Sequence, residues 1–295
     1  MDDKITFSII VFNGDFVLKQ VLESIYPFAY KIVIAEGPVG FWVNKGHTTS
    51  ADDTNKILDE FPDPEKKIEI IHGQFKEKTE MCQAWFKLVP KDTDYVWCVD
   101  GDEVYKQSDI KKVINLLEKE KPSTVGFQSN TFFGGFDHIM TGFERRHSFK
   151  RILKYVPGCE YVNHRPPTIC VNGKEPKGAH IKGEELFKRT GVEMYHYSYL
   201  SPKMVHDKIK YYEQSVIKTG DCIPGYFKGV WLRWVCNPKE RKQIEDTYNG
   251  VHEFRPQIRG AARTAPFTGS HPEVIQRDMK QLKEKFYTQL KLYVG

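Results

Sequence analysis

Apolar positions in the first hundred residues alternate between two kinds of spacing. Short runs rich in aliphatic and aromatic residues predict buried strands over 5–12, 31–35, 67–72 and 94–99. Between these runs, apolar positions recur at helical spacing and predict helices over 16–25, 54–61 and 76–88. Strands that alternate with helices in this order favour a parallel sheet with right-handed crossovers.

The pattern is less regular in the rest of the chain. It predicts a helix over 108–120, one strand over 124–133, and helices over 202–218 and 272–292. Residues 134–190 carry many Gly, Pro and aromatic residues without a clear period. The sequence therefore predicts an α/β sheet region followed by a part of the chain whose elements the pattern leaves open.

Composition and charge exclude several classes of protein. The chain has 295 residues with 44 Lys+Arg and 39 Asp+Glu, a formal net charge of +5 that suits an anionic small substrate but does not support a nucleic-acid partner. The first apolar run is too short for a secretory signal, and no stretch approaches the roughly 20 apolar residues of a membrane helix. The six cysteines form no CxxC pair, which predicts reduced thiols and no zinc site. We expect a cytoplasmic protein without a membrane span.

The strand predicted over 94–99 ends in an acidic turn. Asp100, Asp102 and Glu103 place three carboxylates within four residues, and carboxylates this close raise one another's pKa unless a cation is bound. Mg²⁺ and Mn²⁺ take carboxylate oxygens and complete their shell with substrate phosphates. Ligands of an open α/β sheet bind outside the carboxyl ends of its strands. The turn therefore predicts a divalent-metal site, against the alternative of a solvated acidic turn.

Three segments, in this order, resemble family 2 glycosyltransferases with the GT-A fold. They are the opening strand and polar turn at 7–13, the segment 31–36 that continues at 50–54 after an insertion at 38–49, and the acidic turn at 100–103. The resemblance covers residues 4 to about 105 and is weaker beyond. It implies an α/β, Rossmann-like GT-A fold with a mostly parallel sheet flanked by helices and an aromatic-rich C-terminal extension.

The same resemblance implies two domains and a function. We expect a nucleotide-sugar-binding catalytic domain over 1–218 and a loop-rich, helical extension packed on it over 219–295. The activity implied is metal-dependent transfer of a sugar, with inversion, from a UDP- or GDP-linked donor to a hydroxyl of a carbohydrate, lipid or protein acceptor. Phe41 and Trp42, in the insertion, are predicted to line or cover the donor site.

Site residues follow from the resemblance position by position. The nucleotide would be held by Glu36, Asp52, Lys78, Asp100 and Arg146. Mn²⁺ or Mg²⁺ would be held by Asp100, Asp102 and a later His, for which His196 is favoured because a similar His-Tyr segment follows the acidic turn in relatives. His164 and His180 stay as alternatives for this ligand, and a core histidine is the competing interpretation of His196.

Charge neutralisation and proton transfer leave more than one candidate. A diphosphate leaving group needs cations beside the metal, and the candidates are Arg145, Arg146, Lys150 and Arg151. Inverting transfer needs a base within hydrogen-bond reach of the acceptor hydroxyl, and the candidates are Asp137, His164 and Glu184. The acidic pair that often supplies this base in the family has no clear counterpart, which leaves the stereochemistry open.

Two other functions compete with glycosyl transfer. A nucleotidyltransferase also uses an α/β sheet and acids for Mg²⁺, but it favours a Gly-rich loop with Arg and Lys where this chain has Asn13, Gly14 and Asp15. A non-catalytic nucleotide-sugar-binding module would explain the missing acidic pair. The presence of both Asp100 and Asp102 argues against such a module.

Overall fold

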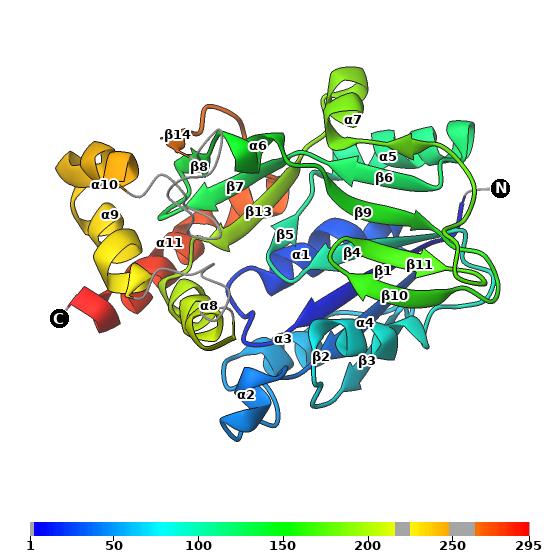
Figure 1. Cartoon of the computed structure of the whole chain (residues 1–295), viewed down its shortest axis with the longest axis horizontal. Coiled ribbons are helices and arrows are strands. Elements are labelled where there is room, and N and C mark those ends of the chain that lie inside the picture. Colours follow the sequence, from blue (N-terminus) through cyan, green and yellow to red (C-terminus); the bar gives the residue numbers. More distant parts are fainter. Residues whose placement is uncertain (1–2, 216–224, 248–262, 295) are drawn as a thin grey trace. The chain divides into compact units, whose positions relative to one another are not determined.

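The computed structural model describes residues 3–215, 225–247 and 263–294 (Figure 1). The chain forms two compact units that interleave along the sequence. The first unit comprises Met1–Gln128, Ser148–Met194 and Pro272–Val274, and the second comprises Ser129–His147, Tyr195–His271 and Ile275–Gly295. The domain boundary predicted between residues 218 and 219 lies outside the described residues.

A seven-stranded sheet forms the centre of the first unit, in the order β12-β6-β9-β4-β1-β2-β3. Its strands are β1 (Ile5–Val11), β2 (Lys31–Glu36), β3 (Ile68–His72), β4 (Tyr95–Asp100), β6 (Thr124–Phe127), β9 (Phe149–Lys154) and β12 (His180–Ile181). Strand β1 pairs in parallel with β2 and β4, β2 with β3, and β12 with β6, whereas β9 runs antiparallel to β4 and β6. The predicted α/β class with a mostly parallel sheet is confirmed.

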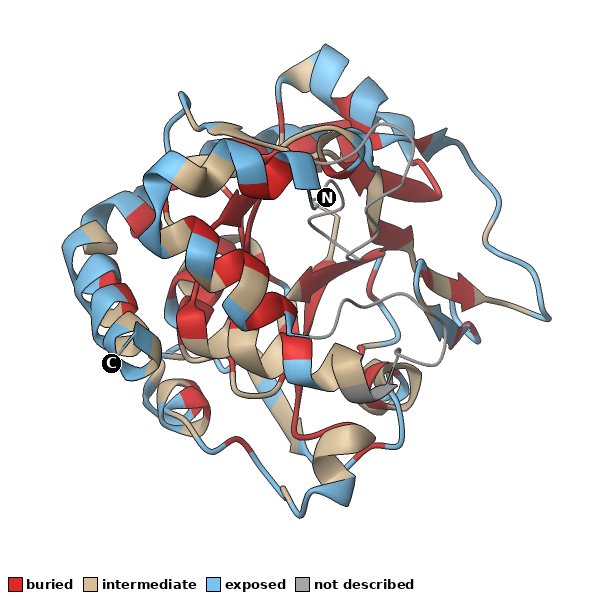
Figure 2. Cartoon of the chain, turned by 60° about the vertical axis from the view of Figure 1, so that its left-hand side comes forward, coloured by how far each residue is buried: buried red, intermediate tan, exposed pale blue. Residues whose placement is uncertain are grey.

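Four helices connect these strands where the apolar spacing predicts them, and they are α1 (Leu18–Ile25), α3 (Thr54–Glu60), α4 (Lys78–Phe86) and α5 (Gln107–Glu120). A further helix of this unit, α7 (Gly183–Thr190), lies in the region where the spacing predicts none. Helix α1 buries Leu18, Val21, Leu22 and Ile25, its predicted apolar face. Figure 2 shows buried residues along the strands and exposed residues on the outward sides of helices, the pattern that burial of apolar surface produces.

The strand predicted over 124–133 is wrong as a single element. It is two strands, β6 and β7 (Ser129–Phe133), which belong to different sheets. Every residue of both strands is buried, including the polar Ser129, Asn130 and Thr131 of β7, and only Gln128 separates the two strands, so the sequence shows no loop at the change of sheet. The region that follows contains β8 (His138–Met140), α6 (Phe143–Arg146), β10 (Glu160–His164) and β11 (Pro167–Cys170), short elements whose periods are too brief to read from the sequence.

The second unit is built around an aromatic core. Strands β14 (Thr264–Pro266), β8, β7 and β13 (Met194–Tyr199) lie in this order, and its helices include α8 (Pro202–Ser215), α9 (Arg233–Cys236), α10 (Arg241–Thr247) and most of α11 (Glu273–Val294). Phe132 stacks on Tyr197 at 4.7 Å between ring centroids, and Phe133 meets Trp234 edge-on at 5.0 Å. The aromatic residues of this part therefore pack against one another as a core. Among the described residues, no helix combines the length and the apolar character that crossing a bilayer requires.

Candidate functional site

Two segments far apart in the sequence meet at the carboxyl end of β1. The backbone N–H of Asn13 donates to Ser50 Oγ at 2.9 Å, and Asn13 Oδ1 accepts from the backbone of Ala51 at 2.8 Å. The backbone N–H of Gly14 donates to Thr54 Oγ1 at 2.9 Å. We call residues 13–15 together with 49–54 the nucleotide loop. The family resemblance includes the polar turn after the first strand and the segment 50–54 as two separate segments, and the structure brings them into contact.

Asp52 orders this loop from within. One of its carboxylate oxygens accepts from the backbone N–H and the hydroxyl of Thr54, at 3.0 Å and 2.5 Å. The other oxygen accepts from the backbone N–H of Asp15 at 3.4 Å. Asp52 therefore joins the two segments of the loop, while its part in binding a nucleotide stays a prediction.

Glu36, the last residue of β2, is fully buried. Its carboxylate accepts from the backbone N–H of Ser50 at 2.8 Å and from Thr49 Oγ1 at 3.1 Å, and it lies 3.0 Å from His72 Nδ1. These contacts hold the nucleotide loop against the ends of β2 and β3. The predicted contact of Glu36 with a nucleobase stays a prediction.

The insertion at 38–49 directly follows a backbone position, Gly37, that only glycine can occupy. Gly37 has a φ of 145°, and a Cβ there would lie 1.8 Å from the carbonyl oxygen of Gly73. The short helix α2 (Phe41–Asn44) follows, and the Trp42 ring lies 6.0 Å from the Phe12 ring between centroids. Trp42 thus lies beside the residue that follows β1, but a role in covering the donor stays a prediction.

Two predicted metal ligands meet in the acidic turn after β4. Asp100 ends β4, and the turn leads through Asp102 into the short strand β5 (Glu103–Val104). Asp100 and Asp102 can each offer one carboxylate oxygen, and these oxygens lie within 4.8 Å of one another. Hard divalent cations prefer such oxygen donors, so this pair fits Mg²⁺ or Mn²⁺.

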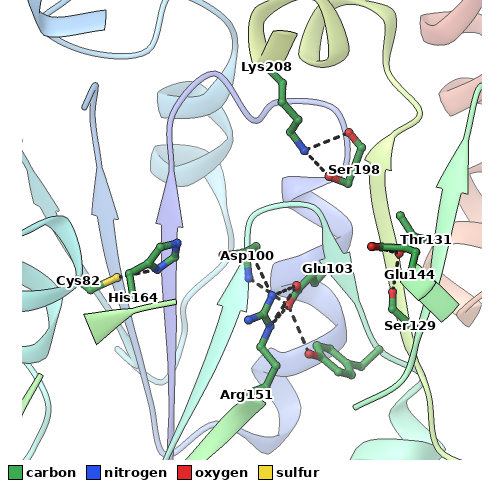
Figure 3. A network of polar contacts seen from close by, with 11 residues as sticks. Cys82, Asp100, Glu103, Ser129, Thr131, Glu144, Arg151, His164, Ser198 and Lys208 are labelled. Atoms are coloured by element: carbon green, nitrogen blue, oxygen red, sulfur yellow. Dashed lines mark hydrogen bonds and ion pairs between the residues drawn. The ribbon is translucent and has the colours of Figure 1, made fainter. Parts of the chain in front are cut away.

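Arg151 on β9 balances the charge of this turn, as Figure 3 shows. Its Nε donates to both oxygens of the fully buried Glu103 at 2.9 and 3.1 Å, and its Nη2 donates to Asp100 at 3.0 Å. Burial acts to lower the pKa of Arg151, but the carboxylates of Glu103 and Asp100 outweigh it and raise the pKa well above its ordinary value. The guanidinium therefore stays charged and pairs with both carboxylates.

A small cavity of about 10 Å³ lies at the carboxyl ends of β1 and β4, and Asp100, Cys82, Tyr161 and His164 are among the residues that line it. His164 Nδ1, at the end of β10, lies 3.6 Å from Cys82 Sγ. Burial lowers the pKa of His164 to about 4, so the imidazole is neutral near pH 7. A neutral imidazole of such low basicity is a weak proton acceptor, and the predicted role of His164 as a base stays a prediction.

The remaining predicted residues are distributed over both units. Lys78 begins α4 in the first unit. Asp137, Arg146 and His196 belong to the second unit, where His196 lies buried on β13 and Arg146 is exposed on α6. The Asp137 side chain is 81% exposed; burial acts to raise its pKa, but contact with His138 outweighs this and the pKa is lowered. The roles predicted for these four residues stay predictions.

Two alternatives from the sequence have other partners in the structure. Nδ1 of His180, on β12, lies 2.9 Å from Thr124 Oγ1. Glu184, on α7, forms an ion pair with Lys188 at 2.7 Å on an exposed helix face. Sequence reasoning missed the cavity residues Cys82 and Tyr161, because an isolated Cys in an apolar helix and an isolated Tyr carry no signal of a shared site.

Residues 48–169 match the family model described as Glycosyl transferase family 2. The matched segment contains the second half of the nucleotide loop, the acidic turn, Arg151 and His164. The family resemblance predicted from the sequence is thereby confirmed for this part of the chain. No curated protein matches the chain.

Several solved structures show a low-level likeness. TarS 1–349 from S. aureus, in complex with UDP-GlcNAc, is 12% identical with a TM-score of 0.33 over 44% of this chain and 35% of that chain. Glucosyl-3-phosphoglycerate synthase from Mycobacterium tuberculosis, in complex with Mn²⁺ and UDP-glucose, is 14% identical with a TM-score of 0.30 over 44% of each chain.

The 4-diphosphocytidyl-2C-methyl-D-erythritol synthase from Anaerococcus prevotii is 11% identical with a TM-score of 0.31, over 52% of this chain and 70% of that chain. The chain thus covers about a third of the length of the TarS chain. At such TM-scores, these likenesses carry no argument about function.

Proposed function

We propose that this chain, whose residues 48–169 match glycosyl transferase family 2, transfers a glycosyl group from a nucleotide-diphosphate sugar to an acceptor hydroxyl. The observation that carries the proposal is the acidic turn inside the matched segment. Asp100 and Asp102 present carboxylate oxygens within 4.8 Å of one another at the carboxyl end of a central strand. That is where the ligands of an open α/β sheet bind.

A divalent cation is the cofactor that this donor set favours. Asp100 and Asp102 would hold Mn²⁺ or Mg²⁺, and we propose His196 as the third ligand, since neutral imidazole is a common metal ligand. When bound, the ion stabilises the negative charge that develops on the diphosphate leaving group. Arg151 leaves the acidic turn able to accept such an ion, because it balances only part of the charge of Asp100, Asp102 and Glu103.

The nucleotide loop is the proposed binding surface for a UDP- or GDP-linked donor. Asn13, Gly14 and Asp52 hold it in one conformation before any ligand arrives, which reduces the entropy that binding must overcome. The acceptor is a hydroxyl of a carbohydrate, lipid or protein. For an inverting transfer, Asp137 is the proposed base because its side chain is accessible, at 81% exposure.

Nucleotide binding measured with and without metal tests this proposal. We expect UDP or GDP to raise the melting temperature only when Mn²⁺ or Mg²⁺ is present, because ligand binding to the native state stabilises it. Asp102→Asn should abolish the metal-dependent part. Asp59→Asn, an exposed acid on α3 in the same unit, is the matched control and should leave it unchanged.

Product analysis separates this function from its competitors. A glycosyltransferase releases a nucleoside diphosphate from the sugar donor, whereas a nucleotidyltransferase releases pyrophosphate from a nucleoside triphosphate. Donor binding without turnover across an acceptor panel would favour the binding module. Metal-independent binding that survives Asp102→Asn would contradict the metal assignment.

A further inference from the structure

The long helix α11 packs into the second unit through one side. Along the helix, Leu282 and Phe286 are buried. Further on, the Tyr293 ring lies 5.0 Å, between centroids, from the ring of His206 on α8 and from the ring of Phe227. Because positions 282, 286 and 293 recur at helical spacing, these contacts fix how the helix is turned about its axis. They therefore also determine which side chains point outward.

The opposite side of α11 carries both lysines and apolar side chains. Positions 280, 283, 287, 291 and 294 follow one another at steps of three or four residues, so their side chains share one face. Position 292 borders this face near the end of the helix. We call these residues the outer face of α11, and all of them are exposed: Lys280, Lys283, Tyr287, Lys291, Leu292 and Val294.

The apolar members of the outer face lie close together. Tyr287, Leu292 and Val294 are 59%, 76% and 54% exposed. They are three of the seven large hydrophobic residues that are exposed in the described part of the chain, and they fall within eight consecutive positions. Single exposed apolar residues are common on proteins, whereas a group of them surrounded by polar residues is typical of a surface that binds a partner.

The charge of the second unit indicates the sign of that partner. The sequence of this unit has 19 Lys+Arg and 11 Asp+Glu, a net charge of +8, whereas the first unit has 25 and 28, a net charge of −3. From Lys280 onward, α11 has four lysines and one acid, Glu284. Within the described residues, no carboxylate forms an ion pair with Lys280, Lys283 or Lys291. These ammonium groups therefore attract an anionic partner.

The outer face of α11 fits a lipid surface better than a nucleic acid. Nucleic-acid phosphates attract lysine, but they offer Leu292 and Val294 no apolar surroundings. A membrane with anionic lipids attracts lysine and also takes apolar side chains at the boundary between its head groups and acyl chains. A tyrosine suits this boundary, because its ring is apolar and its hydroxyl is polar.

We propose that the outer face of α11 binds the surface of a membrane that contains anionic lipids. Tyr287, Leu292 and Val294 enter the boundary region, and the lysines of the same face contact the negatively charged head groups, with their alkyl chains along the apolar side chains. The helix lies on the membrane and does not cross it. This inference does not depend on the proposed function, because no donor, metal or acceptor takes part in the contact.

Binding to vesicles tests the charged part of the contact. Co-sedimentation is measured, without nucleotide, with vesicles of phosphatidylcholine alone and of equimolar phosphatidylcholine and phosphatidylserine. We expect the wild type to bind only the second kind. The triple variant Lys280→Gln, Lys283→Gln, Lys291→Gln should bind them about 100-fold more weakly, because each lysine near an anionic surface contributes about 5-fold.

A matched triple variant separates this face from the overall charge of the chain. Lys87→Gln, Lys111→Gln and Lys119→Gln remove three exposed lysines of the first unit and should leave vesicle binding within about 2-fold of the wild type. Both triple variants replace exposed side chains, so thermal unfolding should stay close to that of the wild type. Equal losses of vesicle binding in the two triple variants would overturn the inference.

The apolar part of the contact is tested without a change of charge. Leu292→Ser should weaken binding to the phosphatidylserine vesicles by about 10-fold, as expected when one leucine side chain no longer leaves water. Val162→Ser, which replaces an apolar residue of the first unit that is 44% exposed, is the matched control and should bind like the wild type. Unchanged binding in Leu292→Ser would overturn the proposed insertion.

Other partners for the same face give different results. Failure of the wild type to bind phosphatidylserine vesicles would overturn the inference. Self-association that rises with protein concentration and disappears in Leu292→Ser would also overturn it, because a second copy of the chain would then cover this face. Tighter binding to single-stranded RNA than to the vesicles, lost in the Lys280, Lys283 and Lys291 variant, would overturn it in favour of a nucleic-acid partner.

Discussion

The nucleotide loop and the acidic turn lie in the same unit and are held in opposite ways. In the loop, Asn13, Ser50 and Thr54 and the partly buried carboxylate of Asp52 form hydrogen bonds with backbone N–H groups, without an ion pair between them. In the turn, the buried carboxylate of Glu103 depends on the guanidinium of Arg151, 48 positions later in the chain. In the loop, each hydrogen bond can be removed without loss of the others, so its contacts are separable. In the turn, Arg151, Glu103 and Asp100 depend on one another's charge and form one charged unit.

This difference determines what each network costs when it is broken. A neutral hydrogen bond contributes about 1 kcal/mol net, and water can replace it where the groups are partly exposed. A buried charge left without its partner costs about 3–5 kcal/mol, because nothing else in the interior compensates it. We therefore expect graded effects in the nucleotide loop and an all-or-none effect in the acidic turn.

Removal of Arg151 should give the largest effect. Arg151→Met keeps the length of the side chain but leaves Glu103 and Asp100 without their counter-charge, and we expect a loss of about 3–5 kcal/mol in the free energy of unfolding. Urea unfolding monitored by tryptophan fluorescence measures this loss.

Two further variants show whether charge is the cause. Lys150→Met removes the neighbouring cation of β9, which pairs with Glu175 at 3.1 Å near the surface, and it should cost less than about 1 kcal/mol. Glu103→Gln added to Arg151→Met should recover part of the loss, because it removes one unpaired charge. Equal losses for Arg151→Met and Lys150→Met would contradict the charged-unit interpretation.

The second-largest effect is expected in the pH dependence of stability, to which His164, beside the acidic turn, contributes and the nucleotide loop variant Asn13→Gly does not. Burial lowers the pKa of His164 from 6.5 to about 4. Between pH 6.5 and about pH 4, His164 binds a proton in the unfolded chain but not in the folded protein. The contribution of the neutral imidazole to stability is therefore fully present above the pKa of the unfolded chain, and it is lost as the pH falls towards the pKa of the folded protein. Between about pH 7.5 and about pH 4.5 we expect His164 to account for a loss of about 2 kcal/mol.

Unfolding at the two pH values in the wild type and in His164→Gln measures this contribution. The variant should lose less stability than the wild type over the same interval. Asn13→Gly, in the nucleotide loop, is the control and should lose as much as the wild type, because it removes no titratable group. Parallel losses in the wild type and His164→Gln would show that the His164 imidazole is not desolvated.

The two networks also differ in how far the sequence predicted them. The strands and helices up to β4, apart from the short helix α2, follow from local periodicity. Asp100 and Asp102 are recognisable because they are adjacent to a buried strand. The family resemblance joins the segment 31–36 with 50–54, whereas the contacts of Asn13 and Gly14 with 50–54 come from the structure alone. Each of these signals lies within a few residues of the chain.

The contacts that complete the acidic turn carry no such local signal. The sequence offers Arg151 as a candidate cation, but its position opposite Glu103 depends on β9 inserting antiparallel between β4 and β6. The contact between Cys82 and His164 depends on the β10–β11 hairpin, whose two short strands have no readable period. Tertiary pairing over long separations decides both contacts, and a single sequence does not encode it in any one window.

A smaller effect is expected for the side chain of Asn13. Asn13→Ala removes the acceptor for the backbone N–H of Ala51. It also leaves alanine at a φ of 50°, a conformation that asparagine adopts more easily because its side chain can form local hydrogen bonds. Together these changes should cost about 1–2 kcal/mol. Asn13→Gly removes the same acceptor but tolerates the backbone conformation, so it should cost less than Asn13→Ala in thermal unfolding. The reverse order would mean that the backbone conformation is not strained.

The smallest effect is expected for Ser50, and it tests whether the loop contacts are separable. Ser50→Ala removes only the hydroxyl that accepts from the backbone N–H of Asn13, and because Asn13 is half-buried, water can replace it at a cost of about 0.5 kcal/mol. Residues in contact commonly couple by about 0.5–3 kcal/mol, but Asn13→Ala keeps the backbone N–H that donates to Ser50. We therefore expect the costs of Ser50→Ala and Asn13→Ala to add to within about 0.5 kcal/mol. A strongly non-additive pair would mean that the nucleotide loop, like the acidic turn, behaves as one unit, and the contrast between the two networks would no longer hold.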